Sequence, residues 1–273
     1  MGSKVFTRRG ALALAAATGA AVAVGAPRAA FAGSGTNVLR AGESLGANQY
    51  LRSPNGAYTA AMQGDGNFVL YTPTGARWST RTGGQNGSSI VMQGDGNLVM
   101  YKNGAAIWHT GTAGYTGASL VMQDDGNLVL YHSSGAIWAT SWHWVWGRTQ
   151  PSNPNGQQDC SWYAYQRFRG FSGVYPNLSV GGFAHTWNET AVAQGWLVIN
   201  DPKTQCVVCF ERGVAGASTT NGHLGWVDFM QRRSDGIYVH VWEMNFGGGL
   251  GVEHQRWVKH VPNGMSYIMA PQL

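Results

Sequence analysis

The stretch Met62–Tyr71 reads MQGDGNFVLY, and nearly the same decapeptide returns at Met92–Tyr101 (MQGDGNLVMY) and at Met122–Tyr131 (MQDDGNLVLY). The copies are 30 residues apart, and a Trp follows seven residues after the last Tyr of each copy. A fixed period with turn-forming spacers such as Asn103-Gly104 is typical of a supersecondary unit that stacks on itself. The sequence therefore predicts three units of short antiparallel strands around one axis.

Each decapeptide, taken as one strand, has a polar face and an apolar face, because side chains on a strand alternate with period two. In the first copy the polar face carries Gln63, Asp65, Asn67, Val69 and Tyr71, and we expect the apolar face and the Trp residues to form a shared core. Two amides, a carboxylate and a phenol donate and accept hydrogen bonds at several points, which suits the hydroxyls of a sugar. The alternative is that these groups form only cross-strand ladders or solvated turns.

The pattern Q-x-D-x-N-x-V-x-Y resembles the bulb-type, mannose-binding lectins, and the resemblance covers about Asn37 to Ser141. It implies an all-β, threefold β-prism with up to three sites for mannose-like sugars, and it makes a homodimer through this lectin half a further expectation. The sugar-binding residues that it implies are Gln63, Asp65, Asn67, Val69, Tyr71, Gln93, Asp95, Asn97, Val99, Tyr101, Gln123, Asp125, Asn127, Val129 and Tyr131.

The segment Trp142–Trp146 reads WHWVW, and on a strand its three Trp side chains would share one face. Two roles stay open for it: a terminal strand that completes a neighbouring sheet or a partner subunit, and a second sugar platform. The following stretch contains Pro and Ser and is typical of a linker. We therefore expect a lectin domain over 33–146, a linker over 147–155 and a second domain over 156–273.

Beyond Asn155 the period disappears, and the pattern of helices followed by strands predicts an α+β domain. Asp159 is expected to cap a helix that runs from Cys160 to a stop near Gly170. A second helix is expected over 183–194. The expected strands are 206–210, 222–230, 237–245 and 256–261.

The second half contains the residue types of a cysteine hydrolase, which needs a thiolate, an imidazole and a polar group that orients the imidazole. The helix dipole favours a thiolate at Cys160, while the neighbouring charge of Asp159 opposes it. His223 follows a glycine and opens a strand. Glu243 and Asn245 lie two residues apart on the next strand and could converge on one histidine. The alternative for Cys160 is a buried hydrophobic residue, which is the commoner role of a lone cysteine.

The strings DCSWYAYQRF, FAHTWNETAVAQGW, GHLGWVDF and YVHVWEMN look like the CHAP family of papain-like cysteine amidohydrolases and peptidases that cleave peptidoglycan. The resemblance covers about Pro154 to Leu273. It implies Cys160 as the nucleophile, His223 as general base and then acid, Glu243 as the residue that orients His223, and Asn245 as a further polar partner. It implies no cofactor.

Cys206 and Cys209 are expected to be core hydrophobic residues, and His240, on the strand face opposite Glu243, is expected to be structural. These two cysteines are three residues apart on a strand and face opposite ways, so no disulfide is expected between them. A zinc site would need further ligands, and none is near in the sequence. The histidines that rank below His223 as the base, because none follows a glycine, are His185, His240, His254 and His260.

The charge of the chain excludes some function classes. Among 273 residues there are 18 Lys and Arg against 13 Asp and Glu, a net charge of +5. Lys4, Arg8, Arg9 and Arg28 all precede residue 33, and the rest of the chain carries only +1. Binding to nucleic acid or to an anionic membrane through charge is therefore excluded.

The first 32 residues resemble an export signal. A charged start precedes the apolar run Ala11–Ala26, and Ala30-Phe31-Ala32 provides a cleavage site. Arg8-Arg9 resembles a twin-arginine (Tat) signal. The apolar run is shorter than the ~20 residues of a membrane span, so after cleavage we expect a secreted protein with no membrane attachment.

Together these resemblances predict a secreted, cell-wall-associated bacterial peptidoglycan hydrolase, an amidase or endopeptidase, that a lectin domain targets to mannose-type glycans. No metal is expected, because no cluster of acidic residues suggests calcium. One alternative is a carbohydrate-binding, agglutinating protein whose CHAP domain is catalytically idle, and another is an enzyme that acts on an amide outside the wall.

Overall fold

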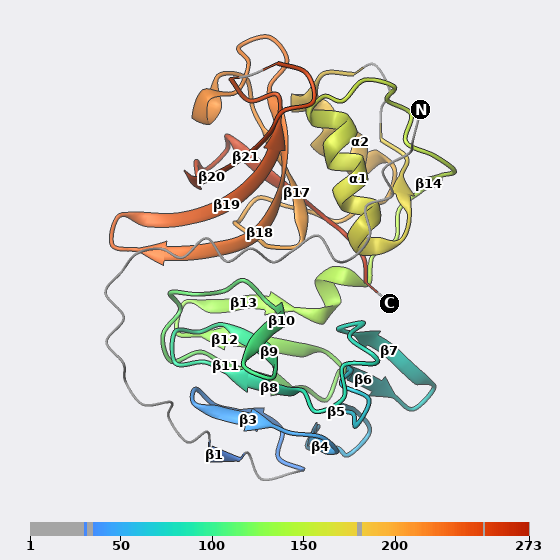
Figure 1. Cartoon of the computed structure of the whole chain (residues 1–273), viewed down its shortest axis with the longest axis vertical. Coiled ribbons are helices and arrows are strands. Elements are labelled where there is room, and N and C mark those ends of the chain that lie inside the picture. The colour runs from blue at the N-terminus through green and yellow to red at the C-terminus, as the bar shows by residue number, and fades with distance from the viewer. Residues whose placement is uncertain (1–29, 32–34, 179–181, 248, 273) are drawn as a thin grey trace.

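The computed structural model describes residues 30–31, 35–178, 182–247 and 249–272. The expected export signal lies outside the described residues, apart from Ala30–Phe31. The N-terminal half, blue to green in Figure 1, consists of strands as far as Ala139, and the C-terminal half, yellow to red, packs two helices against a sheet. Within the described part of the chain, no helix is both long enough and apolar enough to cross a membrane.

The N-terminal half is built from short strands in three sheets. The strands are β1 (Ala30–Phe31), β2 (Val38–Leu39), β3 (Glu43–Leu45), β4 (Gln49–Arg52), β5 (Thr59–Met62), β6 (Phe68–Thr72), β7 (Gly75–Ser79), β8 (Ser89–Met92), β9 (Leu98–Lys102), β10 (Ala105–His109), β11 (Ser119–Met122), β12 (Leu128–His132) and β13 (Gly135–Ala139). The sheet orders are β4-β5-β6-β7, β1-β3-β8-β9-β10 and β13-β12-β11-β2. Each copy of the repeat thus contributes one hairpin to its own sheet, as the period predicts.

The three sheets meet at a core of tryptophans. Trp78, Trp108 and Trp138 come from β7, β10 and β13, and their ring centroids lie 5.5 to 6.2 Å apart in edge-to-face pairs. Such pairs are the favoured geometry of aromatic rings. The apolar positions of the repeats are buried around them, which confirms the expected shared core; these are Met62, Phe68, Leu70, Met92, Leu98, Met100, Met122, Leu128 and Leu130.

The expectation that each decapeptide is one continuous strand is wrong. Met62 ends β5 and pairs with Phe68, the first residue of β6, so the residues between them form the turn of a hairpin. Oδ1 of Asp65 accepts the backbone N–H of Asn67, a local bond that favours a turn over a strand. Gly66 has φ +85°, and a Cβ there would overlap the carbonyl of Gln85.

The C-terminal half is α+β, as expected. Its elements are β14 (Thr149–Gln150), α1 (Cys160–Ser172), β15 (Tyr175–Pro176), the 3-10 helix η2 (Ala184–Thr186), α2 (Trp187–Ala193), β16 (Val198–Ile199), β17 (Cys206–Phe210), the 3-10 helix η3 (Val214–Gly216), β18 (His223–Arg233), β19 (Gly236–Met244), β20 (Glu253–Lys259) and β21 (Met265–Met269). The antiparallel sheet has the order β16-β21-β17-β18-β19-β20, and α1 packs on its β18 and β19 strands.

The segment Trp142–Trp146 is not a strand, which corrects the expectation for it. Its first residues belong to the 3-10 helix η1 (Thr140–His143). His143 is fully buried, and its ring Nδ1 lies 2.7 Å from the carbonyl oxygen of Ala270 while its own carbonyl accepts from the backbone of Gln272. The chain turns here because the imidazole is held by the C-terminal segment of the other half. The three Trp side chains therefore do not share one strand face.

The two halves are in direct contact. The carbonyl of Gly111 accepts from the backbone N–H of Met230 at 2.7 Å, and Thr204 donates to the carbonyl of Thr110 at 2.6 Å. The stretch expected as a linker also packs on the C-terminal half, because β14 pairs with β15.

Candidate active site and sugar-binding motifs

Cys160 is the first residue of α1 and is half-buried. Asp159 caps this helix as expected, because its side chain accepts the backbone N–H of Trp162 at 2.8 Å. The helix continues past the expected stop to Ser172, and Gly173, with φ +87°, ends it in the left-handed conformation. The thiol therefore lies at the N-terminal end of a dipole that favours negative charge.

His223 is the first residue of β18 and is buried. Gly222 before it has φ +71°, and a Cβ there would come within 2.5 Å of the Phe210 carbonyl oxygen and 2.9 Å of the His185 nitrogen. Only glycine fits this turn, so the Gly-His pair has a structural reason. The turn brings the imidazole next to the start of α1.

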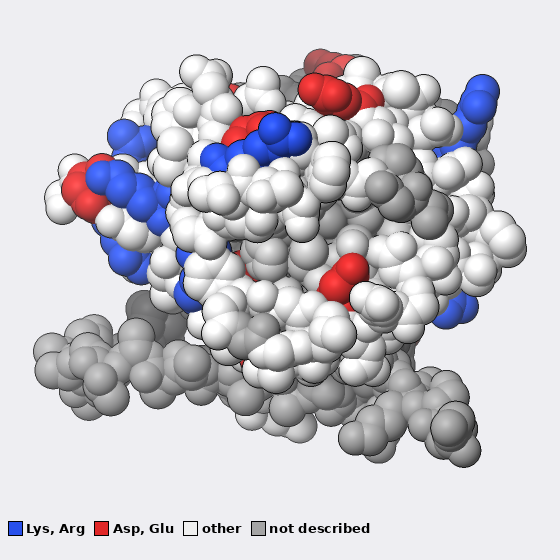
Figure 2. All heavy atoms as spheres, turned by 90° about the horizontal axis from the view of Figure 1, so that it is seen from above, with Lys and Arg blue, Asp and Glu red and all other residues white. Residues whose placement is uncertain are grey.

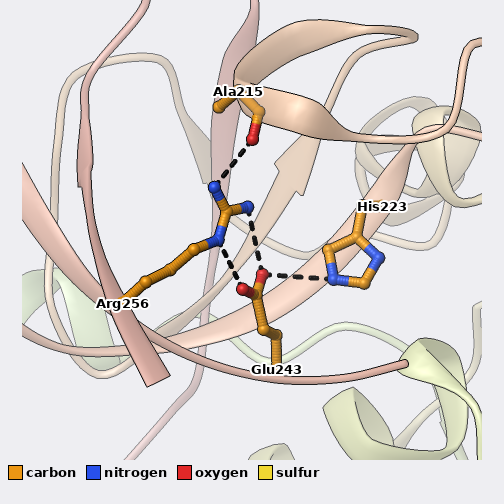
Figure 3. Close-up of polar contacts among 4 residues, drawn as sticks. All are labelled: Ala215, His223, Glu243 and Arg256. Atoms are coloured by element: carbon orange, nitrogen blue, oxygen red, sulfur yellow. Dashed lines mark hydrogen bonds and ion pairs between the residues drawn. The ribbon is translucent and has the colours of Figure 1, made fainter. Parts of the chain in front are cut away.

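Glu243 lies near the end of β19 and is fully buried. Its Oε2 is 3.2 Å from Nε2 of His223, and the same carboxylate forms an ion pair with Arg256 of β20 (Figure 3). Arg256 also donates to the carbonyl of Ala215 at 2.7 Å and lies 3.6 Å from the ring centroid of Phe246. The carboxylate is thus fixed from two sides.

Arg256 is absent from the residues that the sequence suggested. A fully buried carboxylate requires a compensating cation or hydrogen bonds. If Glu243 is assumed to be buried, the sequence does point to Arg256 as its partner, because Arg256 begins the strand that is expected next, over 256–261.

The contacts of His223 determine its protonation. Burial alone would lower the pKa of His223, but hydrogen bonding and charge interactions with Cys160 and Glu243 outweigh burial and raise this pKa to about 9. Because Nε2 faces Glu243, Nδ1 is the ring nitrogen left for the thiol of Cys160. Burial alone would raise the pKa of Glu243, but His223 and Arg256 hold it below its usual value.

Asn245 lies just beyond β19 with φ +63°, so the strand alternation that would align it with Glu243 has already ended. Its side-chain oxygen accepts the backbone N–H of Gly251 at 3.0 Å. The structure therefore directs this amide oxygen to the loop before β20, and the contact with His223 is made by Glu243.

Cys206, Cys209, His240 and His260 take structural positions. Cys206 and Cys209 are fully buried and free, and burial raises the pKa of Cys209 to about 12. His240 pairs with Asp228 through Nδ1 at 2.8 Å. Nδ1 of His260 lies 3.0 Å from the hydroxyl oxygen of Tyr267.

In the three candidate sugar-binding motifs, the Gln and the Tyr of each copy are joined by a hydrogen bond. Nε2 of the Gln donates to the Tyr hydroxyl in all three copies, at 2.6 Å for Gln63 and Tyr71, 2.7 Å for Gln93 and Tyr101, and 3.0 Å for Gln123 and Tyr131. The repeat therefore places an equivalent polar pair on all three sheets.

The Asn and the Val of each motif are less accessible to a ligand than expected, because the Asn oxygen already accepts hydrogen bonds within the protein and the Val side chain is buried. Oδ1 of Asn67 accepts from the Thr80 hydroxyl and the Thr82 backbone, and Asn97 and Asn127 repeat this arrangement. The Val residues are only 2 to 3% exposed, because they pair within the hairpins; they are Val69, Val99 and Val129. A sugar could touch only a small part of each Val.

Among the residues that the structure describes, no three His, Cys, Asp or Glu side chains gather in a way that could hold a metal ion.

Comparison with known proteins gives separate matches for the two halves. The family model of the CHAP domain matches residues 149–245. An N-acetylmuramoyl-L-alanine amidase domain-containing protein of Staphylococcus aureus is 34% identical over 116 residues, which is 42% of this chain and 17% of that protein. The staphylococcal secretory antigen SsaA is 30% identical over 112 residues, 41% of this chain and 38% of the antigen. The chain thus spans less than two fifths of the length of these relatives.

The N-terminal half is similar to solved lectins. A monomeric mannose-binding lectin from Gastrodia elata is 40% identical, with a TM-score of 0.36, over 38% of this chain and 96% of the lectin. The mannose-specific agglutinin of snowdrop (Galanthus nivalis) is 36% identical, with a TM-score of 0.34, over 36% of this chain and 91% of the agglutinin. The protein thus carries a CHAP domain at 149–245, preceded by a region that resembles the bulb-type mannose-binding lectins with their three-fold β-prism.

Proposed function

We propose that this protein is a secreted bacterial cell-wall hydrolase that cuts a peptide amide of peptidoglycan with Cys160 as its nucleophile. The CHAP domain and the amidase-named relative support a peptidoglycan hydrolase. The observation that carries the cysteine mechanism is the contact of His223 with the buried carboxylate of Glu243 on one side and with Cys160 on the other.

The reaction follows from these positions. The Cys160 thiolate attacks the amide carbonyl carbon, and a C–S bond forms as the carbonyl becomes tetrahedral. His223 then gives its proton to the amide nitrogen, the C–N bond breaks and the free amine leaves. Water, deprotonated by His223, hydrolyses the thioester and restores the thiol. Glu243 keeps the imidazole oriented throughout, and Arg256 keeps Glu243 ionised.

The lectin half supports targeting. Binding to mannose-type glycans would raise the effective concentration of the hydrolase at a glycosylated surface. The face of the C-terminal half in Figure 2 has few charged side chains, scattered singly or in small mixed groups. Recruitment by specific sugar contacts therefore fits this protein better than recruitment by charge.

The domain limits belong to the same proposal: an export signal over 1–32, a lectin domain over 33–146, a connection over 147–155 and a CHAP domain over 156–273. The homodimer expected from the lectin resemblance stays a prediction. Light scattering of the secreted form tests it.

The test is hydrolysis of purified bacterial cell walls by the secreted form, which is residues 33–273 without the proposed export signal, and by its Cys160→Ala variant. We expect the variant to release amino groups at less than about one thousandth of the parent rate, because the covalent step loses its nucleophile. Cys206→Ala, which removes a fully buried thiol, is the matched control and should retain activity. Mass spectrometry of the released products identifies which amide bond of peptidoglycan is cut.

Equal release by the parent and Cys160→Ala would remove the nucleophile assignment. Binding to mannan without release from walls by either protein would favour the alternative of a carbohydrate-binding protein with an idle CHAP domain.

A further inference from the structure

A cavity of about 480 Å³ lies between the two halves of the molecule. Residues of the lectin half, including Arg81 and His109, line it together with Phe171, Trp226 and Asp228 of the C-terminal half. Phe171 lies eleven positions after Cys160 on α1, which at 1.5 Å per residue places the cavity roughly 16 Å along the helix from the thiol. The cavity is therefore separate from the candidate active site.

One wall of the cavity is aromatic. The rings of Trp226 and Phe171 pack with centroids 5.6 Å apart, and Trp108 of the tryptophan core adds a further ring. Ligand pockets commonly combine such apolar walls with a few fixed polar groups. An aromatic wall suits the C–H face of a sugar ring.

Polar atoms of three lining residues have no hydrogen-bond partner among the described residues. They are Oε1 of Gln205, Oε1 of Gln272 and Nδ1 of His109, and the two glutamines are only 7% and 3% exposed. A buried acceptor without a partner is destabilising and calls for an explanation. Since amide oxygens only accept, the group that satisfies them must donate, as a hydroxyl does.

The cavity is held in shape by backbone constraint. Gln205 has φ +59°, which is uncommon for a residue with a side chain, and its Nε2 donates to the carbonyl of His109 across the junction of the two halves. Such conformations persist only where surrounding contacts enforce them, and they concentrate at functional positions.

The charges around the cavity are already engaged within the protein. Asp228 pairs with His240 at 2.8 Å and accepts from the Trp242 indole, while Arg81 donates to the carbonyl of Phe171 at 2.9 Å. Burial lowers the pKa of His109 to about 4, so its imidazole is neutral at ordinary pH. A ligand with hydroxyl donors and no net charge matches these surroundings.

We propose that this cavity binds a neutral saccharide of one or two rings, and that it is a fourth sugar site in addition to the three repeated motifs. The volume lies within the range of small-molecule pockets. The proposal does not depend on hydrolysis by Cys160, because it concerns binding alone.

The test uses the secreted form with Asp65, Asp95 and Asp125 replaced by Ala, so that binding at the motif sites is removed. α-Mannobiose and N,N′-diacetylchitobiose are titrated separately by calorimetry, one as a mannose-type and one as a wall-type saccharide. We expect one of them to bind with one site per chain. Failure of both to bind would overturn the proposal.

Gly170 offers a matched pair of variants. It lines the cavity, and a Cβ added there meets no atom within 4 Å. Gly170→Trp in the same background should fill the cavity and weaken binding at least tenfold, while Gly170→Ala should leave the affinity unchanged. Equal affinity of all three proteins would contradict the location.

Gln272→Met tests the saccharide site without filling the cavity. The change removes the unpaired Oε1 with little change in size, so the fold should be as stable or more stable. Saccharide affinity should nevertheless fall at least tenfold. Unchanged affinity in a folded Gln272→Met protein would show that this oxygen does not contact the ligand and would refute the proposed site.

Discussion

Oε2 of Glu243 lies 3.2 Å from Nε2 of His223, and the carboxylate that makes this contact is fully buried. The contact assigns the two ring nitrogens, because it leaves Nδ1 toward Cys160. It also gives the imidazole a fixed orientation before any substrate arrives. The catalytic proposal therefore depends on this pair as much as on the thiol.

Glu243→Gln should lower the rate of wall hydrolysis by about 10²–10⁴-fold, because an amide neither stabilises the imidazolium nor holds the same tautomer. The pKa of His223 should fall below its value of about 9 at the same time. The rate is measured from released amino groups, and the pKa by NMR titration of the imidazole in a folded sample.

Glu43→Gln, in the strand β3 of the lectin half, is a matched control that should change neither quantity. A Glu243→Gln protein with the parent rate and the parent His223 pKa would show that Glu243 has no role in positioning.

The stability of the protein should depend on pH through His223. Its folded pKa of about 9 lies above the ordinary histidine value of 6.5, so the stabilisation is fully present below pH 6.5 and is lost as the pH rises through about 9. At 1.36 kcal/mol per unit, the contribution is on the order of 3 kcal/mol at most. Urea unfolding of the parent and of His223→Gln between pH 6 and 10 measures it, and a stability difference that stays constant over this range would argue against the raised pKa.

Arg256→Met should destabilise the protein by up to about 3–5 kcal/mol, because it removes one of the two cationic groups, Arg256 and His223, that pair with the buried carboxylate of Glu243. Arg256 also holds the pKa of Glu243 down, so its loss should raise that pKa and move the acid limb of wall hydrolysis to higher pH. Arg256→Lys keeps the charge and should lie between the parent and Arg256→Met. The pH–rate profile and urea unfolding are the measurements, and an unshifted acid limb in a folded Arg256→Met protein would contradict the assignment.

Some features were predictable from the sequence because they depend on local or repeated patterns. The period of the decapeptides predicted the three sheets and the tryptophan core, and Asp159 before an apolar-periodic stretch predicted the start of α1. The strand 206–210 was predicted with the bounds that β17 has. These features need no knowledge of distant contacts.

Other features depend on contacts between distant segments and were missed. The burial of His143 against Ala270 turns the WHWVW segment away from a strand, and nothing near it in the sequence indicates this. Arg256 becomes recognisable only when β19 and β20 are paired so that it faces Glu243. The strand β21 (Met265–Met269) is fully buried and lacks the alternation by which half-buried strands are recognised.

Replacing Asp65, Asp95 and Asp125 together by Ala should abolish retention on immobilised mannan, because each motif then loses its carboxylate acceptor. The change also removes the bond from Oδ1 to the following Asn backbone in each turn, so a stability loss of about 1 kcal/mol per site is expected. Affinity chromatography and thermal unfolding measure the two effects separately.

Asp124→Gly is the matched control for that experiment. Asp124 occupies the position that glycine holds in the first two copies, and its side chain accepts from the backbone of Asn55. Removing this one carboxylate should leave retention intact. Undiminished retention of the triple variant would mean that the sugar contacts lie elsewhere on the lectin half.

Asp159→Ala should lower the free energy of unfolding by about 1 kcal/mol, because the backbone N–H of Trp162 loses its capping acceptor. Asp159→Asn retains a capping oxygen and should cost much less, yet it removes the negative charge next to Cys160 and so favours the thiolate. The two variants therefore separate the cap from the charge. Urea unfolding should distinguish Asp159→Ala from the parent, and iodoacetamide should alkylate Cys160 faster in Asp159→Asn than in the parent at the same pH. Equal alkylation rates for the parent and Asp159→Asn would show that the charge of Asp159 does not influence the reactivity of the thiol.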